Sequence, residues 1–453
     1  MPVKTANKGW VVTFSGTGIN LALGILYTWS IFKGAIRESI EAGGEGAFNW
    51  PLAALNDPYA VCCMVFAFAM ILAGRCQDKF GPRMTAFVGG ILVGLGFIWI
   101  SRTTSYTAWV LGFGVLAGAG IGFGYSAATP PALKWFPSSK TGLIAGLVVS
   151  GFGLASLYIA PLSKYFLGMW GLKGAMLFFG IAFLVVVCGL SLILVNPPEG
   201  FVPGHMPVDA SKIPPPDEAL VKPTLSRAGV SAEAQRTAQA FRPSEDARPS
   251  EIMKTRTFYT LWFIYFIGAG AGLMVIGSVA GMAKKSLGEA AFLVVAIMAV
   301  GNAAGRIIAG VLSDRIGRRN TLMIMLLFQT VLMLLAIPIV GAENGHGVVL
   351  VFLATFIGFN YGTNLSLFPS FAKDLWGLKN FGTNYGILFT AWGVGGFVMG
   401  RLSQMLQAAT GSYTSSFMTA AALLIAGAFL TLTLKDRASS TVFVKSEAAL
   451  SSH

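Results

Sequence analysis

The sequence predicts an all-α membrane protein whose twelve transmembrane helices form two pseudo-symmetric six-helix bundles. The composition, the spacing of apolar runs and an internal repeat support this fold class. Of the 453 residues, 55% are hydrophobic and 11% are charged, whereas about 25% are charged in a typical soluble protein. Such a chain would expose a large apolar surface in water, so we expect lipid to be its solvent.

Twelve apolar runs are each near the ~20 residues that cross a ~30 Å hydrocarbon core. The first run follows MPVKTANKG; it is too long for a signal peptide and has no small-residue cleavage site, so it is the first predicted helix. The predicted spans are Trp10–Phe32, Asp57–Gly74, Met84–Ser101, Ala108–Ala128, Gly142–Leu162, Leu172–Val195, Phe258–Ala283, Ala290–Val311, Thr321–Gly341, Gly347–Pro369, Phe381–Met399 and Ser415–Leu434.

Charge predicts the orientation of these spans. Lysine and arginine are more frequent in the short segments on the side of the two termini, which places both termini in the cytoplasm of a multi-pass protein, in a bacterial inner (cell) membrane. The net charge of +13 comes from basic residues scattered singly between apolar runs. They are typical of topology signals and not of a nucleic-acid-binding face.

The chain divides into four predicted regions. Residues 1–195 form the N-terminal bundle and residues 257–438 the C-terminal bundle. Between them, residues 196–256 hold half of the 20 prolines and little apolar sequence, which predicts a cytoplasmic linker, most simply a tether. Residues 439–453 form a polar tail, predicted to be disordered.

An internal repeat relates the two bundles. Three short motifs recur in the same order at offsets of 236 or 240 residues, which is typical of transporters in which one bundle rocks against the other. The pairs are GRCQDKFGPR (Gly74–Arg83) with GVLSDRIGRR (Gly310–Arg319), GFGY (Gly122–Tyr125) with GFNY (Gly358–Tyr361), and GLVVSGFG (Gly146–Gly153) with GILFTAWG (Gly386–Gly393).

The first of these motifs resembles the G-x-x-x-D-R-x-G-R-R signature of the major facilitator superfamily, and the second copy matches every fixed position. Its aspartates stand at helix ends, where a carboxylate can meet a helix N-terminus and neighbouring arginines. We expect the motif to act as a conformational latch; the alternative is that its charges only enforce orientation. The predicted latch residues are Gly74, Asp78, Arg83, Gly310, Asp314, Arg315 and Arg318.

Three further segments resemble the oxalate:formate antiporter branch, which includes bacterial lactate and pyruvate carriers and is related to the monocarboxylate transporters. They are Leu21–Phe32, Pro249–Met274 and Asn384–Gly396. The resemblance covers the chain except for the central linker. It implies the major facilitator fold and a small organic anion as substrate.

Arg306 is the one charged residue that we place well inside a predicted span, eight residues or about 12 Å before Asp314. An arginine at this depth is costly and usually faces a cavity. Its guanidinium can hold a carboxylate through two parallel hydrogen bonds. The alternative is a guanidinium that reaches the cytoplasmic face or bonds helix-end carbonyls. Met70 is the equivalent in the first half.

Four further side chains are candidate substrate ligands. Asn302 lies one turn from Arg306 and can bond a substrate hydroxyl or keto oxygen. Tyr125 and Tyr361 occupy equivalent positions in the two halves and resemble cavity-lining positions of the family, and Tyr27 lies in an aromatic stretch. Packing between helices remains the alternative for each of them.

Trp392 departs from the pattern of the oxalate carriers, which have a lysine at the corresponding position of their NYG-FYTAK motif. With Arg306 as the only cation, one carboxylate is compensated and a second is not. The sequence therefore predicts a monocarboxylate of the lactate, pyruvate or formate class. The alternatives are a dicarboxylate/formate exchanger, an efflux carrier of lipophilic compounds and a non-transporting membrane carboxylate sensor.

For coupling we expect proton symport, with Asp57 at the outer mouth of the second span as the candidate carrier; anion exchange without a proton is the alternative. The four cysteines lack metal-ligand spacing, and there is no nucleophile–base pair or phosphate-binding loop. We therefore expect no enzymatic site, no cofactor and no metal, and we expect a monomer in the lipid bilayer.

Overall fold

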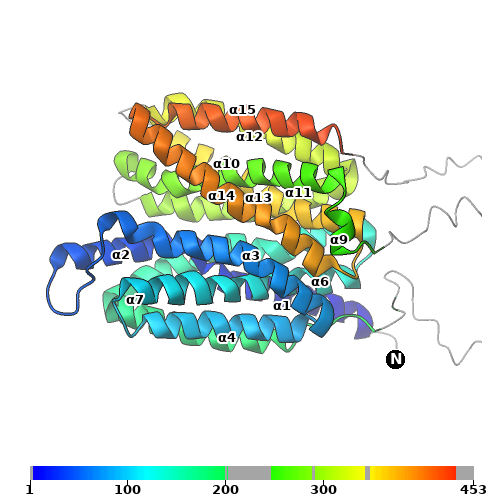
Figure 1. The fold of residues 1–453 in the computed structure, drawn as a ribbon, viewed down its shortest axis with the longest axis horizontal. Coiled ribbons are helices and arrows are strands. Elements are labelled where there is room, and N and C mark those ends of the chain that lie inside the picture. Colours follow the sequence, from blue (N-terminus) through cyan, green and yellow to red (C-terminus); the bar gives the residue numbers. More distant parts are fainter. Residues whose placement is uncertain (1–3, 199–200, 202–245, 288–290, 342–346, 435–453) are drawn as a thin grey trace, which may run out of the picture.

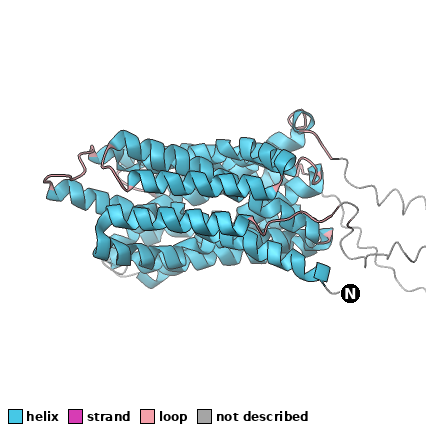
Figure 2. Cartoon of the chain, turned by 90° about the horizontal axis from the view of Figure 1, so that it is seen from below, coloured by secondary structure: helices cyan, strands magenta, loops and turns pink. Residues whose placement is uncertain are grey.

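The computed structural model describes residues 4–198, 201, 246–287, 291–341 and 347–434, which form a bundle of long helices (Figures 1 and 2). Ten of the described helices are long and apolar enough to cross a membrane. One of them, Ser138–Ser191, contains two spans because its backbone turns at Gly171. Helix α14 (Phe381–Thr410) is a further helix of this length. The predicted all-α membrane fold is confirmed.

The first half contains six spans, and its first span is longer than predicted. Helix α1 continues through a short 3-10 turn into α2 and ends at Ala42, ten residues beyond Phe32. A π-helical segment joins α5 to α6, and Gly171 has a left-handed φ of 65° inside α7. The elements are α1 (Lys4–Leu23), the 3-10 turn (Gly24–Thr28), α2 (Trp29–Ala42), α3 (Asp57–Phe80), α4 (Pro82–Ile100), α5 (Tyr106–Trp109), the π-helical segment (Val110–Ala117), α6 (Gly118–Trp135) and α7 (Thr141–Ser191).

The second half repeats this order. A short helix precedes six long ones: α9 (Pro249–Ile252), α10 (Arg256–Leu287), α11 (Ala291–Ile316), α12 (Arg318–Gly341), α13 (Gly347–Trp376), α14 (Phe381–Thr410) and α15 (Thr414–Thr431). Helix α13 continues past Pro369, where we expected the span to end. Most of the predicted linker and the predicted tail lie outside the described residues.

A single glycine ends α3 and another ends α11, at equivalent positions of the repeated motif. Gly81 has a φ of 83° and Gly317 a φ of 90°. A residue with a side chain pays a steric penalty in this left-handed region. The glycine near the end of each motif therefore lets the chain reverse within one residue, between α3 and α4 and between α11 and α12.

The two halves lie side by side, with α3 against α14 at the boundary (Figure 1) and α7 against α11. Glycines allow this close contact. A Cβ atom at Gly74 would lie 2.0 Å from the Gly382 carbonyl oxygen, and one at Gly142 would lie 2.1 Å from the Gly310 carbonyl oxygen. Small residues at helix interfaces are typical of membrane bundles, where van der Waals packing replaces hydrophobic association.

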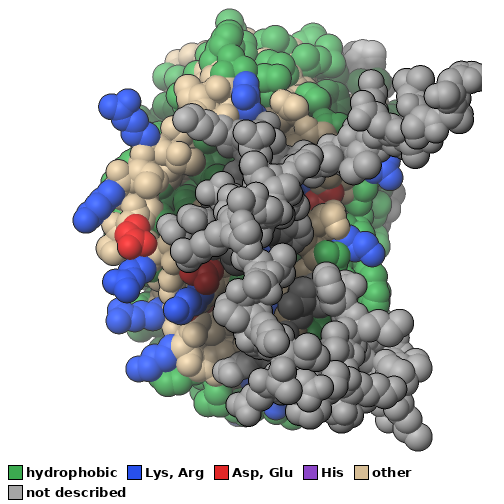
Figure 3. Space-filling view, turned by 90° about the vertical axis from the view of Figure 1, so that its right-hand side faces the viewer, with side chains coloured by type: hydrophobic (Ala, Val, Ile, Leu, Met, Phe, Trp, Pro, Cys, Tyr) green, Lys and Arg blue, Asp and Glu red, His purple; other side chains and the backbone are tan. Residues whose placement is uncertain are grey.

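Lysine and arginine side chains gather at one end of the bundle (Figure 3), the end at which the described chain begins and α15 ends (Figure 1). Large apolar side chains such as Phe14, Leu72 and Phe429 are exposed along the helices. This distribution of charge and apolar surface belongs to a multi-pass membrane protein.

The end of the predicted linker packs onto the turn between α13 and α14. Asp246 Oδ1 accepts hydrogen bonds from the backbone N–H groups of Leu378 and Lys379, both at 3.0 Å. Asn380 and Asn384 donate to the Ala247 carbonyl oxygen. The last residues of the linker are therefore attached to the second half of the molecule.

Packing predicts which glycines are essential for stability. A Cβ atom at Gly305 would lie 1.9 Å from the Phe359 carbonyl oxygen, whereas one at Gly189 meets nothing within 4 Å. We expect Gly305→Ala to destabilise the protein by about 1–3 kcal/mol through overpacking, and Gly189→Ala to leave stability unchanged or slightly raised. Thermal unfolding of the purified variants measures both. Equal melting temperatures for the two variants would contradict this packing.

Candidate functional site

Arg306 lies on α11 at the boundary between the halves and is fully buried, with an exposed fraction of 0%. Its Nε donates to Asn302 Oδ1 at 3.0 Å, and its Nη1 donates to the Val149 carbonyl oxygen of α7. Its Nη2 is buried without a hydrogen-bond partner. The ion pairs in the described part of the chain do not include Arg306. One edge of the guanidinium is therefore left without a partner among the described residues.

Glycines of α7 make room for this side chain. A Cβ atom at Gly146 would lie 2.4 Å from the Arg306 carbonyl oxygen, and one at Gly153 would lie 3.2 Å from Arg306 Nε and 3.3 Å from Asn302 Oδ1. Both glycines belong to the repeated GLVVSGFG motif. The motif therefore brings α7 against the guanidinium and its amide partner.

Asn302 contacts Arg306 directly. Because its Oδ1 accepts from Arg306 Nε, the amide orients the guanidinium in this conformation. The same oxygen is the atom that we expected to meet a substrate hydroxyl or keto group. The structure therefore places Asn302 in the site but occupies that oxygen with Arg306.

Three of the predicted ligands form one hydrogen-bonded chain across the boundary. The hydroxyls of Tyr27 and Tyr361 are 2.7 Å apart, and Trp392 Nε1 donates to the Tyr361 hydroxyl at 2.8 Å. Arg306 lies near both tyrosine hydroxyls. The sequence analysis named each residue separately, and the fold brings them together beside the cation.

Three phenylalanines that the sequence analysis missed enclose this chain. Phe152 packs edge-on to Tyr27 with ring centroids 5.2 Å apart, and Phe66 and Phe389 lie 5.2 and 5.1 Å from Trp392. Phe152 and Phe389 both lie within the repeated motifs of α7 and α14, so the repeat was the signal that could have found them. Their rings cover Tyr27 and Trp392.

Tyr125 is buried, and its hydroxyl has no hydrogen-bond partner within the described part of the chain. Tyr265 and Tyr385, which the sequence analysis did not name, also have buried hydroxyls without partners. All three rings surround Phe389, with centroids at 5.5, 6.1 and 5.7 Å. Their helices come from both halves, so these hydroxyl groups also lie at the boundary.

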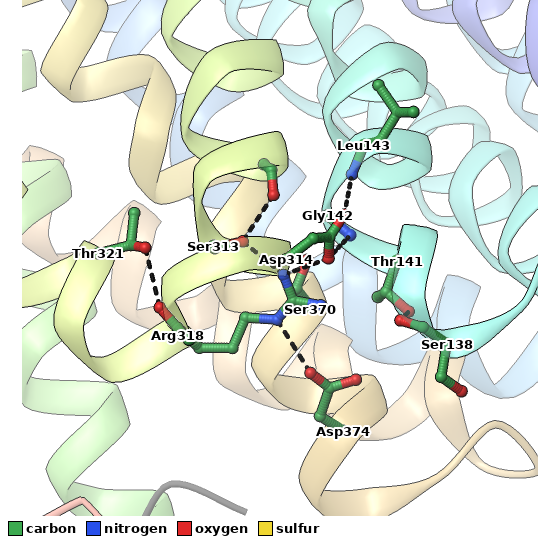
Figure 4. A network of polar contacts seen from close by, with 12 residues as sticks. Ser138, Thr141, Gly142, Leu143, Ser313, Asp314, Arg318, Thr321, Ser370 and Asp374 are labelled. Atoms are coloured by element: carbon green, nitrogen blue, oxygen red, sulfur yellow. Dashed lines mark hydrogen bonds and ion pairs between the residues drawn. The ribbon is translucent and has the colours of Figure 1, made fainter. Parts of the chain in front are cut away.

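The second copy of the repeated motif connects the halves through Asp314 (Figure 4). Its carboxylate accepts from the backbone N–H groups of Gly142 and Leu143 at 2.8 and 2.9 Å, in the first turn of α7. Arg318 forms ion pairs with Asp314 at 2.6 Å and with Asp374 at 2.9 Å. A carboxylate at a helix N-terminus is worth roughly 0.3–2 kcal/mol.

The first copy makes the equivalent contact in the opposite direction. Asp78 accepts from the backbone N–H groups of Gly382 and Thr383 at 2.9 and 2.8 Å, and from the Thr383 hydroxyl at 2.7 Å. These groups lie in the first turn of α14. Each half thus supplies one aspartate that caps a helix of the other half, and both contacts lie at the same end of the bundle.

Three predicted residues lie away from these contacts. Arg83 Nε donates to the Leu194 carbonyl oxygen at 3.2 Å and so joins the ends of two helices of the first half. Arg315 is exposed at the end of α11. Asp57 begins α3, about 30 Å along the helix from Asp78, and accepts from the Tyr106 hydroxyl at 2.8 Å. The structure does not bring Asp57 to Arg306.

Lys373 is a further buried cation at the latch end that the sequence analysis missed. Its exposed fraction is 7%, and its Nζ donates to the Thr141 hydroxyl at 2.7 Å, across the boundary. Because α13 runs to Trp376 and not to Pro369, Lys373 lies in the helix. Arg306 is therefore not the only buried charge among the described residues, but it is the one at mid-span.

Comparison with known proteins agrees with this geometry. The chain belongs to the Major Facilitator Superfamily, which it matches over residues 9–400 and 261–452. It is 27% identical to the uncharacterised MFS-type transporter YhjX of Escherichia coli (strain K12), with 85% of each chain covered. It is 26% identical to the oxalate:formate antiporter of Oxalobacter formigenes, covering 91% of this chain and 88% of the relative.

A further relative is monocarboxylate transporter 13 of Bos taurus, 27% identical over 94% of this chain and 89% of the relative. The family predicted from the repeated loop is confirmed, and the antiporter among the relatives agrees with the predicted branch. These relatives are transporters and not enzymes. The protein is a membrane transporter.

The latch contacts predict a shift in conformation when they are broken. We expect Asp314→Asn to weaken the cap on α7 and so to expose Ala145. This residue is buried on α7, three residues after Gly142, whose N–H donates to Asp314. A cysteine introduced at position 145 should react with a polar maleimide several-fold faster in this variant.

Glu41→Gln is the matched control, because Glu41 makes an exposed ion pair with Arg37 on α2. We expect it to leave the rate of labelling at position 145 unchanged. Equal labelling in the Asp314→Asn variant and the parent would contradict a latch.

Proposed function

We propose that this protein is a secondary active transporter that moves a small monocarboxylate of the lactate, pyruvate or formate class by alternating access. The observation that carries the proposal is the free edge of the Arg306 guanidinium, buried at mid-span between the two halves. A buried cation without a counter-ion is costly, and a bound carboxylate offsets that cost.

The surrounding groups support an anion of limited size. A hydrogen-bonded chain near the guanidinium consists of Tyr27, Tyr361 and Trp392. Phenylalanine rings pack against Tyr27 and Trp392. Arg306 binds the carboxylate of the substrate, and the tyrosine hydroxyls donate hydrogen bonds to the other oxygen atoms of the substrate. Asn302 holds the guanidinium in place through its Oδ1.

Selectivity for one carboxylate follows from charge. Trp392 lies where oxalate carriers of the resembling branch have a lysine, and its indole N–H is neutral. Arg306 compensates one negative charge, so a second carboxylate in this enclosed site would lose its hydration without gaining a cation. A dicarboxylate/formate exchanger is the second candidate, because the unpartnered hydroxyls of Tyr125, Tyr265 and Tyr385 are able to donate to a second carboxylate.

Alternating access accounts for the two latches. Asp78 and Asp314 hold the halves together at the end where lysine and arginine gather, which we infer to be the cytoplasmic end. Opening that end breaks both caps and exposes Arg306 to the cytoplasm. The conformation described here is then the one closed toward the cytoplasm, with both termini on that side of the membrane.

Proton symport is part of this proposal. A monocarboxylate and a proton together carry no net charge, so their joint passage avoids moving charge across the bilayer. Asp57 at the opposite end from the latches is the candidate to receive the proton, and Tyr106 donates to its carboxylate.

Replacing Arg306 by lysine tests the anchor. Arg306→Lys keeps the charge but loses the planar fork, and we expect uptake (kcat/KM) to fall about 10- to 100-fold, the equivalent of one or two charge-assisted hydrogen bonds. Uptake of labelled lactate and pyruvate into proteoliposomes measures the change. Arg37→Lys is the matched control, since Arg37 is exposed on α2. Unchanged uptake in Arg306→Lys would remove the basis of the proposed site.

A substrate panel tests the selectivity and the coupling. We expect lactate or pyruvate to be taken up with at least ~10-fold higher kcat/KM than oxalate, because the second carboxylate of bound oxalate would have no cation beside it. A pH gradient that is acidic outside should accelerate the uptake. Tight oxalate binding with no lactate or pyruvate uptake would favour the exchanger, and insensitivity to the gradient would contradict proton symport.

A further inference from the structure

A second polar cluster lies inside the second half, away from the boundary between the halves. Gln329 of α12 and Asn360, Thr363 and Asn364 of α13 line a narrow space together with Gly268 of α10. Gln329 is eleven residues from the start of α12, about 16 Å along the helix and therefore near mid-membrane. Polar side chains at this depth usually have a functional role.

This cluster is separate from the site at Arg306. On α13, Gly362 faces α11, because a Cβ atom there would lie 2.0 Å from the Asn302 carbonyl oxygen. Asn360 lies two residues before Gly362 and Asn364 two residues after it. Each is therefore rotated by about 200° from Gly362, onto the opposite face of the helix. They face α10 and α12. The body of α13 stands between the two polar sites.

The amide oxygen atoms of the residues that line this space lack hydrogen-bond partners among the described residues. Asn360 and Asn364 donate their Nδ2 atoms to the carbonyl oxygens of Phe356 and Asn360, which fixes the orientation of both amides. Their Oδ1 atoms are buried without a hydrogen-bond partner, as are both Oε1 and Nε2 of Gln329. The exposed fractions are 2%, 5% and 3% for Asn360, Asn364 and Gln329.

Gly268 provides room for one of these oxygens. A Cβ atom at this position would lie 2.6 Å from Asn364 Oδ1. Thr363 adds a fourth oxygen, since its hydroxyl donates to the Asn360 carbonyl at 2.6 Å and keeps its lone pairs. Oxygen acceptors thus outnumber the single free N–H donor group of Gln329.

The first half is an internal control for the fold. At the repeat offset of 236 residues, Gln329, Asn360 and Asn364 correspond to Val93, Gly124 and Ala128. Val93 is fully buried, and Gly124 packs against Leu23 and Ile19. The same scaffold therefore packs with apolar residues at these positions. The amides of the second half are not required by the fold, which indicates a ligand.

We propose that this cluster binds a small monovalent cation, Na⁺, through Gln329 Oε1, Asn360 Oδ1, Asn364 Oδ1 and the Thr363 hydroxyl. Hard cations take oxygen ligands at roughly 2.4 Å, closer than the ~2.8 Å of a hydrogen-bonded water. The space is narrow, so it favours Na⁺, with its shorter distances to oxygen, over the larger K⁺. The four oxygens belong to neutral groups, so a monovalent cation leaves one uncompensated charge and a divalent cation would leave two.

Thermal unfolding of the purified full-length protein without substrate tests the site independently of the proposed transport. At equal ionic strength, we expect Na⁺ to raise the melting temperature by about 2 °C or more relative to K⁺. Gln329→Met and Asn364→Leu should each abolish this difference. Gln329→Glu adds a carboxylate ligand and should enlarge it.

Gln77→Met is the matched control, because Gln77 is a buried glutamine of α3 with an unpartnered Oε1 outside the cluster. It should keep the full difference between Na⁺ and K⁺. Binding of labelled Na⁺ to the wild-type protein, competed by Li⁺ and not by K⁺, provides a readout that does not depend on the stability of the variants. Equal melting temperatures in Na⁺ and K⁺, or a difference that survives Gln329→Met and Asn364→Leu, would overturn the proposal.

Discussion

The arrangement of the two halves depends on a buried guanidinium that has no ion-pair partner in the described part of the chain. Arg306 reaches from α11 to the Val149 carbonyl of α7, so it already connects the two halves while its Nη2 stays unpaired. Two of its nitrogen atoms are held by oxygen atoms, those of the Asn302 amide and the Val149 carbonyl. Any movement of one half against the other changes this environment. A carboxylate that binds here therefore acts on the same contact that holds the halves together.

The latches use a different interaction at the end of the bundle. Asp78 and Asp314 cap the first turns of α14 and α7, and glycines at Gly74, Gly142, Gly310 and Gly382 let the backbones approach closely enough for these caps. Caps of this kind are individually weak. Two weak caps are easier to separate than one strong contact, which fits the alternating access proposed above.

Some features of the molecule follow the internal repeat, and others occur in the second half alone. The latches, the glycine turns and the paired Tyr125 and Tyr361 obey the repeat. Arg306 and the amides of Gln329, Asn360 and Asn364 do not, since the first half has Met70, Val93, Gly124 and Ala128 at these positions. The features shared by the two halves are thus the ones that join them, and the polar groups on which we base the proposed sites belong to the second half alone.

The sequence by itself determined the fold class, the family and the repeat, and it singled out Arg306 as a charge inside a predicted span, because each depends on local composition or on residues at fixed offsets. It could not show that Arg83 bonds the Leu194 carbonyl, that Asp57 is remote from Arg306, or that Phe66, Phe152 and Phe389 pack around Trp392 and Tyr27. It also ended α13 at Pro369 and so missed the contact of Lys373 with Thr141. These contacts join residues far apart in the chain, so only the packing of the helices decides which side chains meet and which polar atoms are left without a partner.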